Sequence, residues 1–266
     1  MQVIEDTQYN LVIRMVKLYE NRFDLNKVTK GMDIAASIVC DWKDVLEVSE
    51  ESLENTKIPV VILNRVIKKP GVSSIACDNF KSAHDAAAYL IGLGHRKIAI
   101  IKGTYYEKDV IDRFEGYKKA LTDRSIPIHD EYMFEGVFSE ETGFKAVKKF
   151  MSQKERPTAI FATNDEMAIG AFMKLQEMGL RCPRDISLIG FDGIAAGQYL
   201  VPSLTTMRQP IDEMARLAVK EVIRALGVGR DAQEGTAQLI EAKLLRGGTC
   251  DRPSYIRAES AVGLKV

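Results

Sequence analysis

Short apolar segments alternate along this chain with longer amphipathic segments, and this alternation constrains the fold more than any other feature. The apolar segments are five to eight residues long and rich in β-branched side chains: Asn10–Met15, Asp33–Cys40, Pro59–Leu63, Lys97–Ile101, Thr158–Ala162 and Ile186–Phe191. Strands that are covered on both faces lack a polar alternation, so these segments are predicted to be buried strands.

The segments between these strands have helical spacing and end at residues that stop helices. Glycine follows each of the clearest three: Asn79–Leu93, Asp165–Met178 and Pro210–Leu226. Ser139, which precedes two glutamates, is a predicted N-cap of a further helix. Strands that alternate with helices predict an α/β fold, a doubly wound parallel sheet with right-handed crossovers.

Polar and aromatic side chains stand where such a sheet binds ligands, beyond the carboxyl ends of its strands. Asn164 and Asp192 come directly after the strands 158–162 and 186–191. Phe138 precedes the helix that begins after Ser139, and Arg113 lies in the first turn of a helix that begins near Val110. We therefore expect Arg113, Phe138, Asn164 and Asp192 to meet at one ligand site.

The chemistry of these four side chains favours a small ligand that is polar at its edges and apolar on one face. Arg113 offers a rigid set of donors, Asp192 offers acceptors, and Asn164 offers both. Phe138 offers a flat apolar surface. A sugar ring or a purine has this combination of properties, and a sugar or sugar phosphate is the favoured prediction.

Each residue also has a purely structural interpretation. Asn164 is suited to cap the helix that starts at Asp165, a role that is compatible with ligand contact. Asp192 is suited to a turn with Gly193. Arg113 alone would form a surface ion pair, and Phe138 alone would belong to the core. The interpretation as a site depends on the four taken together.

Composition argues against several other classes of protein. Lys plus Arg and Asp plus Glu both number 37, so the chain lacks the basic excess of a self-sufficient nucleic-acid binder. The cysteines, Cys40, Cys77, Cys182 and Cys250, lack CxxC spacing, which indicates reduced structural thiols and no metal site. The opening residues do not resemble a signal peptide, and no apolar run is long enough to span a membrane. A cytoplasmic protein is predicted.

Catalytic patterns are weak. His84, His95 and His129 do not accompany a nucleophile elbow, and Walker, GxGxxG and HExxH motifs are absent from the sequence. The sequence therefore predicts no catalytic residues and no cofactor, and a binding protein is favoured over an enzyme.

Five motifs in order resemble those of the lactose/galactose-repressor family of bacterial transcriptional regulators. They are Gly94–Ala99 (GHRKIA), Arg113–Tyr117 (RFEGY), Ala162–Gly170 (ATNDEMAIG), Ile189–Asp192 (IGFD) and Pro202–Pro210 (PSLTTMRQP). The resemblance extends from about Ile58 to Leu245. It implies a periplasmic-binding-protein-like type I fold with two α/β lobes, three crossovers and an effector between the lobes.

The resemblance also implies boundaries and roles. The crossovers would lie near Lys102–Thr104, Met207–Gln209 and Ala242–Leu245. The N-terminal lobe would comprise 1–103 and 209–243, and the C-terminal lobe 104–208 and 244–258, with 259–266 as a tail. Arg113, Asn164 and Asp192 match the polar residues that contact the effector in the family, and Phe138 matches an aromatic residue that stacks on it.

Two departures from the family pattern affect this interpretation. No helix-turn-helix precedes the core, so operator DNA would be bound only through a domain outside these 266 residues. The first strand of the family core also has no counterpart, and residues 3–8 resemble the end of the helix that follows it. The segment Asp41-Trp42-Lys43 has no predicted role.

A ligand-sensing repressor core is the favoured function, and an extracytoplasmic sugar-binding protein of a transporter, which shares the fold, is the alternative. A homodimer is expected, with the helix 79–93 at the interface because it is apolar on more than one face. The alternative for this helix is a fully buried crossover.

Overall fold

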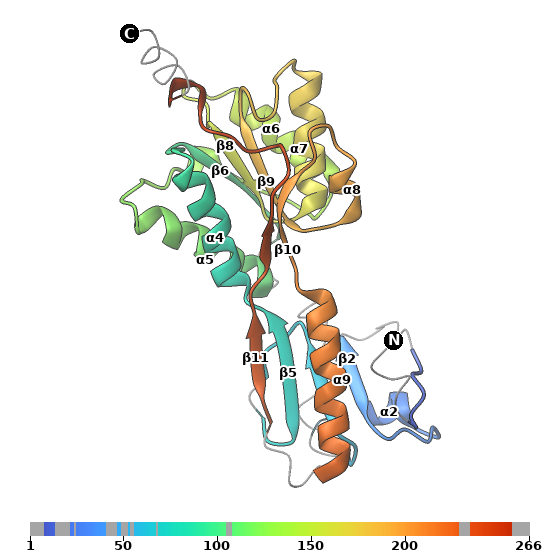
Figure 1. Cartoon of the computed structure of the whole chain (residues 1–266). Helices are drawn as coiled ribbons and strands as arrows, with labels where there is room; N and C mark the ends of the chain where they lie inside the picture. Colours follow the sequence, from blue (N-terminus) through green and yellow to red (C-terminus); the bar gives the residue numbers. More distant parts are fainter. Residues whose placement is uncertain are drawn as a thin grey trace. The chain divides into compact units, whose positions relative to one another are not determined.

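The structure is a computed structural model that describes residues 8–13, 22–23, 25–40, 47–48, 53, 56–67, 69–104, 108–228 and 235–256. The chain forms two compact units (Figure 1). Unit 1 comprises Met1–Cys77 and Pro210–Ile240, and unit 2 comprises Asp78–Gln209 and Glu241–Val266. The chain therefore passes from one unit to the other three times, after Cys77, Gln209 and Ile240.

Unit 1 is built on a four-stranded sheet in the order β11-β5-β4-β2. Its strands are β2 (Ser37–Cys40), β4 (Val60–Leu63), β5 (Val72–Cys77) and β11 (Ala237–Ile240), and neighbouring strands are parallel. The long helix α9 (Ile211–Val228) packs on this sheet against β4 and β5. The short elements α2 (Leu25–Thr29), β1 (Arg22–Phe23) and β3 (Glu47–Val48) complete the described part of this unit.

Unit 2 is built on a six-stranded sheet in the order β12-β10-β9-β8-β6-β7. The strands are β6 (Ile98–Lys102), β7 (Met133–Glu135), β8 (Ala159–Ala162), β9 (Ser187–Asp192), β10 (Thr205–Arg208) and β12 (Lys243–Leu245). The strands are parallel except for β12, which is antiparallel to β10. The carboxyl ends of β6, β8, β9 and β10 therefore lie at one edge.

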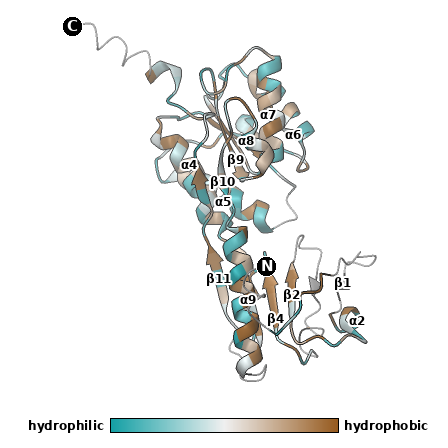
Figure 2. Ribbon diagram, turned by 45° about the vertical axis from the view of Figure 1, so that its right-hand side comes forward, coloured by the Kyte–Doolittle hydropathy of each residue, from teal (hydrophilic) through white to brown (hydrophobic). Residues whose placement is uncertain are grey.

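Helices cover both faces of the six-stranded sheet. The pair α4 (Asn79–Gly92) and α5 (Lys108–Thr122) packs together on one face, and the pair α6 (Glu140–Met151) and α7 (Asp165–Glu177) packs on the other. The 3₁₀ helix Asp130–Tyr132 and the short α8 (Ala195–Gln198) lie in connections. Strands β6 and β8 are buried along their whole lengths, so both faces of this sheet need a cover. Figure 2 shows the same apolar character in the brown strands β2 and β4 of unit 1.

The α/β fold class and most of the predicted elements are confirmed. The helix predicted at 79–93 is α4, those at 165–178 and 210–226 are α7 and α9, and the strands predicted at 59–63, 97–101, 158–162 and 186–191 are β4, β6, β8 and β9. Ser139 caps α6 as expected, because its side chain accepts a hydrogen bond from the Thr142 N–H. The strand predicted at Asn10–Met15 is wrong over residues 10–13, which are irregular, while 14–15 lie outside the described residues.

The predicted lobe boundary near residue 103 is also wrong. Residues 78–103 belong to unit 2, because β6 lies between β8 and β7 in the six-stranded sheet and α4 packs on α5. The first crossing follows Cys77 and not Lys102. The third follows Ile240, because β12 pairs with β10 of unit 2. The predicted tail 259–266, the segment 41–43 and residues 3–7 lie outside the described residues.

Among the described residues, no helix has both the length and the apolar character that crossing a bilayer requires.

Candidate functional site

The edge of the six-stranded sheet formed by the strand carboxyl ends gathers most of the predicted site. Asp192 is the last residue of β9, and Thr163 and Asn164 directly follow its neighbour β8. Gln209 follows β10, the strand on the other side of β9. Arg113, on α5, reaches the same edge from the face of the sheet that α4 and α5 cover.

Arg113 is buried, with only 5% of the residue exposed, and it is fixed by four partners. Its Nε donates to Oδ1 of Asn79 at 2.8 Å, and its Nη1 donates to the carbonyl oxygen of Thr163 at 2.6 Å. The same Nη1 lies 3.3 Å from Oδ1 of Asp192. The guanidinium stacks 3.8 Å above the ring of Phe191. The sequence alone allowed Arg113 a surface ion pair. The pair that it forms with Asp192 is instead largely buried, so solvent screens it much less.

Asp192 retains an accessible carboxylate, since 24% of its side chain is exposed. Its Oδ1 accepts a hydrogen bond from Nε2 of Gln209 at 2.6 Å and faces Arg113. Its backbone is in the left-handed region, with φ of 116°, where a residue with a Cβ is strained. The described polar contacts of the side chain use Oδ1, so Oδ2 is left for another donor.

Asn164 is the N-cap of α7, as its structural interpretation predicted. Its Oδ1 accepts a hydrogen bond from the backbone N–H of Met167 at 2.9 Å, which leaves the two hydrogens of its amide nitrogen for a further partner. The neighbouring Thr163 has a hydroxyl that is buried without a hydrogen-bond partner among the described residues. Capping and ligand contact are thus compatible at Asn164.

Phe138 lies in the connection between β7 and α6, and its ring reaches the end of β6, the strand next to β8. Its ring packs against Gly103, which directly follows β6, and against the hydrophobic core of unit 2. The ring is half-buried and belongs in part to that core. The structure brings Arg113, Asn164 and Asp192 together at the ends of β8 and β9, and places Phe138 one strand away from them.

Two further residues of this edge, Gln209 and Asp165, are not among the predicted site residues. Asp165 is fully buried and follows Asn164 directly. Its Oδ2 accepts hydrogen bonds from the N–H groups of Gly193 and Ile194, and its Oδ1 accepts one from the hydroxyl of Thr206. Burial raises the pKa of Asp165 to about 6, against the opposing effect of these hydrogen bonds.

A sequence signal for Asp165 exists in Gly190. A glycine inside an otherwise apolar strand indicates a close approach by another group. A Cβ at Gly190 would overlap Oδ1 of Asp165, so the glycine makes room for the carboxylate.

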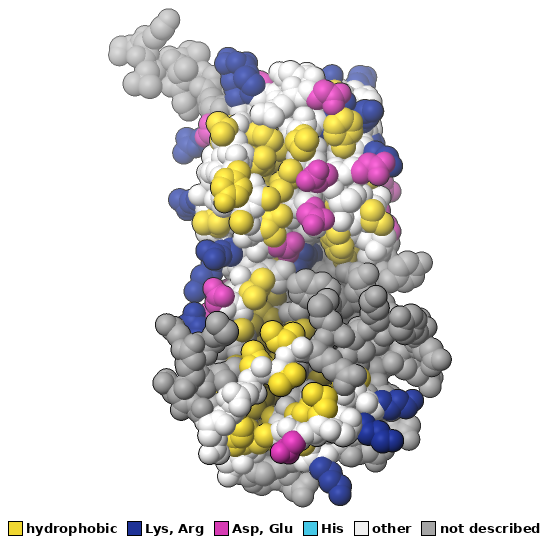
Figure 3. Space-filling view, turned by 90° about the vertical axis from the view of Figure 1, so that its right-hand side faces the viewer, with side chains coloured by type: hydrophobic (Ala, Val, Ile, Leu, Met, Phe, Trp, Pro, Cys, Tyr) yellow, Lys and Arg dark blue, Asp and Glu magenta, His cyan; other side chains and the backbone are white. Residues whose placement is uncertain are grey.

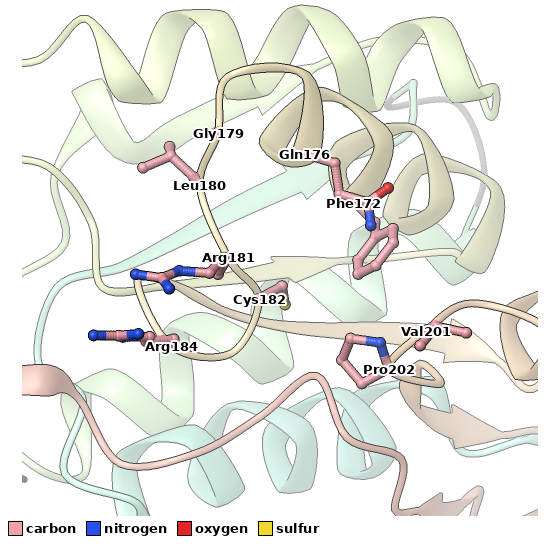
Figure 4. Close-up of a pocket in the computed structure, with 9 residues that line it drawn as sticks. All are labelled: Phe172, Gln176, Gly179, Leu180, Arg181, Cys182, Arg184, Val201 and Pro202. Carbon is pink, nitrogen blue, oxygen red and sulfur yellow. The ribbon is translucent and has the colours of Figure 1, made fainter.

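A separate cavity of about 550 Å³ lies elsewhere in unit 2 (Figure 4). It is bounded by the end of α7, the loop 179–184 and the Val201–Pro202 segment. Phe172 and Pro202 form an apolar side, while Arg181 and Arg184 extend away from it in Figure 4. None of the four predicted site residues lines this cavity, and its open, mixed lining does not resemble the convergent polar groups of a ligand site.

The described residues contain no group of three or more His, Cys, Asp or Glu side chains that could hold a metal ion. The site at the sheet edge offers a buried cation, an accessible carboxylate and an amide. This arrangement can bind and orient a polar molecule.

Comparison with known proteins identifies the family. The model of the periplasmic binding protein-like domain matches residues 87–250, more than half of the chain. The HTH-type transcriptional regulator MalR of Clostridium butyricum is 34% identical over 230 residues, which cover 82% of this chain and 67% of that protein. This chain belongs to the lactose/galactose-repressor family.

Solved structures of lactose/galactose-repressor family members have the same fold. A sugar-binding transcriptional regulator of this family from Escherichia coli, complexed with phosphate, has a TM-score of 0.72 and 29% identity, with 81% of this chain and 77% of that chain covered. A member from Enterococcus faecium with bound ribose has a TM-score of 0.68 and 28% identity, with 76% and 74% covered. The fold is therefore the periplasmic-binding-protein-like type I fold that the motifs implied.

The chain spans about half to two thirds of the length of the curated family members that it matches. Those proteins are HTH-type transcriptional regulators.

Proposed function

We propose that this chain is the ligand-sensing core of a bacterial transcriptional regulator and that it binds a small effector, a sugar or sugar derivative. The observation that carries the proposal is the buried Arg113, which is held against the partly exposed carboxylate of Asp192 at the carboxyl edge of the sheet. Buried charged groups are concentrated at functional sites. The E. faecium relative binds ribose, which supports a sugar over a purine.

The free hydrogen-bonding groups of the site fit the edge of a sugar. Asp192 accepts hydroxyl hydrogens through Oδ2, and the Nη2 of Arg113 has no described hydrogen-bond partner and donates to a ring or hydroxyl oxygen. The amide nitrogen of Asn164 donates to a further oxygen. Phe138 supplies the apolar surface against which one face of the ring packs. A vicinal pair of hydroxyls matches this set of donors and acceptors.

Control of transcription is proposed from the relatives. They are HTH-type regulators, so operator DNA is bound in our proposal by a helix-turn-helix domain of the kind that gives them their name. The 37 basic and 37 acidic residues of this chain do not favour direct contact with phosphates. A cytoplasmic location follows from this role. The family relatives support this proposal over that of a transporter's sugar-binding protein.

A homodimer is also proposed, with a change in the expected interface. Ala83, Ala86, Ala87 and Leu90 of α4 are fully buried within unit 2, while Phe80 is the exposed apolar residue of this helix, and the buried face favours the interpretation of α4 as a covered crossover helix. Tyr199 and Val201 are 83% and 84% exposed. The side of unit 2 that carries α7 and α8 presents several hydrophobic side chains (Figure 3), and we propose that a second copy of the chain covers Tyr199 and Val201 there.

A thermal-shift screen tests the proposed function. The full chain is heated with pentoses, hexoses, sugar phosphates, sugar acids and purine bases, each at millimolar concentration. A ligand that binds only the folded state raises the melting temperature by mass action, and we expect at least one sugar or sugar derivative to do so. A shift with purines alone would contradict the ligand class, and no shift with any compound would contradict a sensing function.

A further inference from the structure

Asp165 is a charged side chain whose bonds all lie inside the protein. It is the first residue of α7 and is completely inaccessible to solvent. Its Oδ2 lies 2.7 Å from the backbone nitrogen of Gly193 and 2.8 Å from that of Ile194. Its Oδ1 lies 2.6 Å from Oγ1 of Thr206. One carboxylate thus connects α7, the loop between β9 and α8, and β10.

The loop segment that Asp165 holds begins immediately after Asp192. Asp192 has a φ of 116° and Gly193 a φ of 78°, so the chain turns sharply at this point. A non-glycine residue persists in this region only where its surroundings enforce it. The two amides that follow Asp192 are those that Asp165 binds, and Gln209 N–H donates to the Asp192 carbonyl from the other side at 3.1 Å.

The carboxylate of Asp165 also depends on Gly190. Gly190 lies in the middle of β9, where glycine weakens a strand because it offers no side chain for packing. A Cβ there would overlap Oδ1 of Asp165 and would approach Leu204 and Ala168 closely. The absence of a side chain at Gly190 is what permits Asp165 to reach the loop beyond β9.

We propose that Asp165 is a positioning residue of the effector site: by binding the N–H groups of Gly193 and Ile194, it fixes the carboxylate of Asp192 in the orientation that receives the ligand. This inference rests on the proposed function in one respect, that Asp192 contacts the ligand. Asp165 itself does not contact the ligand, because it is buried behind the loop that it holds.

The ionisation of Asp165 provides a readout for this role. Burial raises its pKa to about 6. Asp192 faces it as a like charge, Arg113 pairs with Asp192, and the side chain of Arg208 packs against Gly193. A protonated carboxyl accepts hydrogen bonds from amides more weakly than a carboxylate does. The hold on the loop therefore loosens as pH falls through about 6.

The first experiment follows the two amides without any ligand. In the full chain labelled with ¹⁵N-glycine and ¹⁵N-isoleucine, the Gly193 and Ile194 amide resonances are expected to titrate with a midpoint near pH 6. In Asp165→Asn they no longer titrate there but remain protected from hydrogen exchange, because the side-chain carbonyl still accepts both bonds. In Asp165→Ala their protection falls at least about tenfold, the loss expected for a buried hydrogen bond.

The control variant is Glu141→Gln, which removes an exposed carboxylate from the first turn of the neighbouring helix α6 and should behave as the native chain does. The native titration keeps the test decisive even if Asp165→Ala does not fold. Gly193 and Ile194 amides that do not respond near pH 6 in the native chain, or that stay fully protected in a folded Asp165→Ala variant, would overturn the proposal.

The second experiment measures ligand affinity by calorimetry at pH 7.5 with D-ribose as the probe. We expect Asp192→Asn and Asp165→Ala each to weaken binding by about tenfold or more, and Asp165→Asn to restore most of the native affinity. Weakening by Asp192→Asn but not by Asp165→Ala would refute the positioning role and leave the proposed site intact. If Asp192→Asn binds ribose as tightly as the native chain does, the proposed site is wrong. If the native chain does not bind ribose, this result counts against ribose as the ligand. In both cases the amide measurements still decide whether Asp165 holds the loop.

Discussion

Three consecutive polar residues at the end of β8 have three different tasks. The carbonyl of Thr163 accepts a hydrogen bond from Arg113, the side chain of Asn164 caps α7, and the carboxylate of Asp165 holds the loop after β9. All three residues are buried, and polar groups survive there because their bonds offset the cost of desolvation. The hydroxyl of Thr163 is the exception in the part of the chain that the structure describes.

The buried Asp165 should make stability depend on pH in a defined direction. Its pKa is raised to about 6 from 3.8, so between these values the folded chain binds a proton that the unfolded chain does not. The contribution of Asp165 to the free energy of unfolding is therefore fully present below pH 3.8 and is lost as the pH rises to about 6 and above. From pH 5 to pH 7 its contribution to the free energy of unfolding should fall by about 1 kcal/mol.

Urea unfolding at pH 5 and pH 7 measures this contribution. The change in the free energy of unfolding between the two pH values is compared between the native chain and Asp165→Asn, and the contributions of the other titrating groups cancel in this comparison. The native chain should lose more stability than the variant between the two pH values. Parallel changes in both proteins would show that Asp165 has an ordinary pKa.

At the scale of elements, the pair α6 and α7 depends on close backbone contact. A Cβ at Gly170 of α7 would overlap the backbone of Glu140 in α6, and a Cβ at Gly143 of α6 would overlap the carbonyl oxygen of Met167 in α7. The neighbouring atoms belong to the backbone, so the conflict is relieved only if the helices move apart. Because Asn164 and Asp165 begin α7, this packing also determines where the site lies.

We expect Gly170→Ala to destabilise the protein by about 1–3 kcal/mol or more, as overpacking of a close contact does. Gly92→Ala is the matched control, because a Cβ at the end of α4 would meet no atom within 4 Å. This change should be neutral or stabilise by about 0.5–1 kcal/mol through helix propensity. Denaturant midpoints of the two variants provide the comparison, and equal midpoints would refute the role of Gly170 in packing.

The elements that could be predicted from the sequence are those whose interiors are apolar. Strands β4, β6, β8 and β9 consist mainly of aliphatic and aromatic residues, and this pattern predicts them. Strand β5 was missed because its buried Ser73 and Ser74 resemble a turn sequence, and β10 because it begins with Thr205 and Thr206. The hydroxyls of Ser73, Thr205 and Thr206 are buried with partners from distant segments, which a local pattern does not contain.

The residues of the candidate site that directly follow an apolar strand could be predicted from the sequence. Asn164 and Asp192 follow apolar runs directly, so their positions were accessible from the sequence. The roles of Gln209 and Asp165 depend on Asp192 and on the 193–194 backbone, whose positions are fixed by the order of strands in the sheet. Gly190 indicates that some group approaches β9 closely, but it does not identify that group as Asp165. The boundary after Cys77 was missed for the same reason, since a buried strand has the same pattern in either sheet.

At the scale of the whole molecule, the described polar contacts of the site all lie within unit 2. Arg113, Asn164, Asp192 and their partners Asn79, Thr163 and Gln209 belong to it, and Gln209 is its last residue before the chain enters unit 1 at Pro210. Gln209, whose side chain donates a hydrogen bond to Asp192, is therefore adjacent in sequence to a crossing between the units.

The proposed assembly is tested by sedimentation velocity at micromolar concentration. The 29.7-kDa chain should sediment as a dimer. Tyr199→Glu, which places a charge where we propose that a second copy packs, should shift it toward monomer, whereas Phe80→Glu on α4 should not. A native chain that sediments only as a monomer would contradict the dimer, and dissociation by Phe80→Glu alone would return the interface to α4.

A calorimetric titration tests the ligand contact of Asp192 most directly. The ligand is the sugar or sugar derivative that stabilises the chain most in the thermal-shift screen. The native chain, Asp192→Ala and a control, Asp130→Ala at an exposed position, are titrated side by side. Loss of the Asp192 carboxylate leaves a bound hydroxyl without its acceptor and removes the ion pair of Arg113, at a cost of about 1–3 kcal/mol. We expect the affinity to weaken by roughly tenfold or more for Asp192→Ala and to stay unchanged for Asp130→Ala. Unchanged affinity in a folded Asp192→Ala variant would show that Asp192 does not bind the ligand.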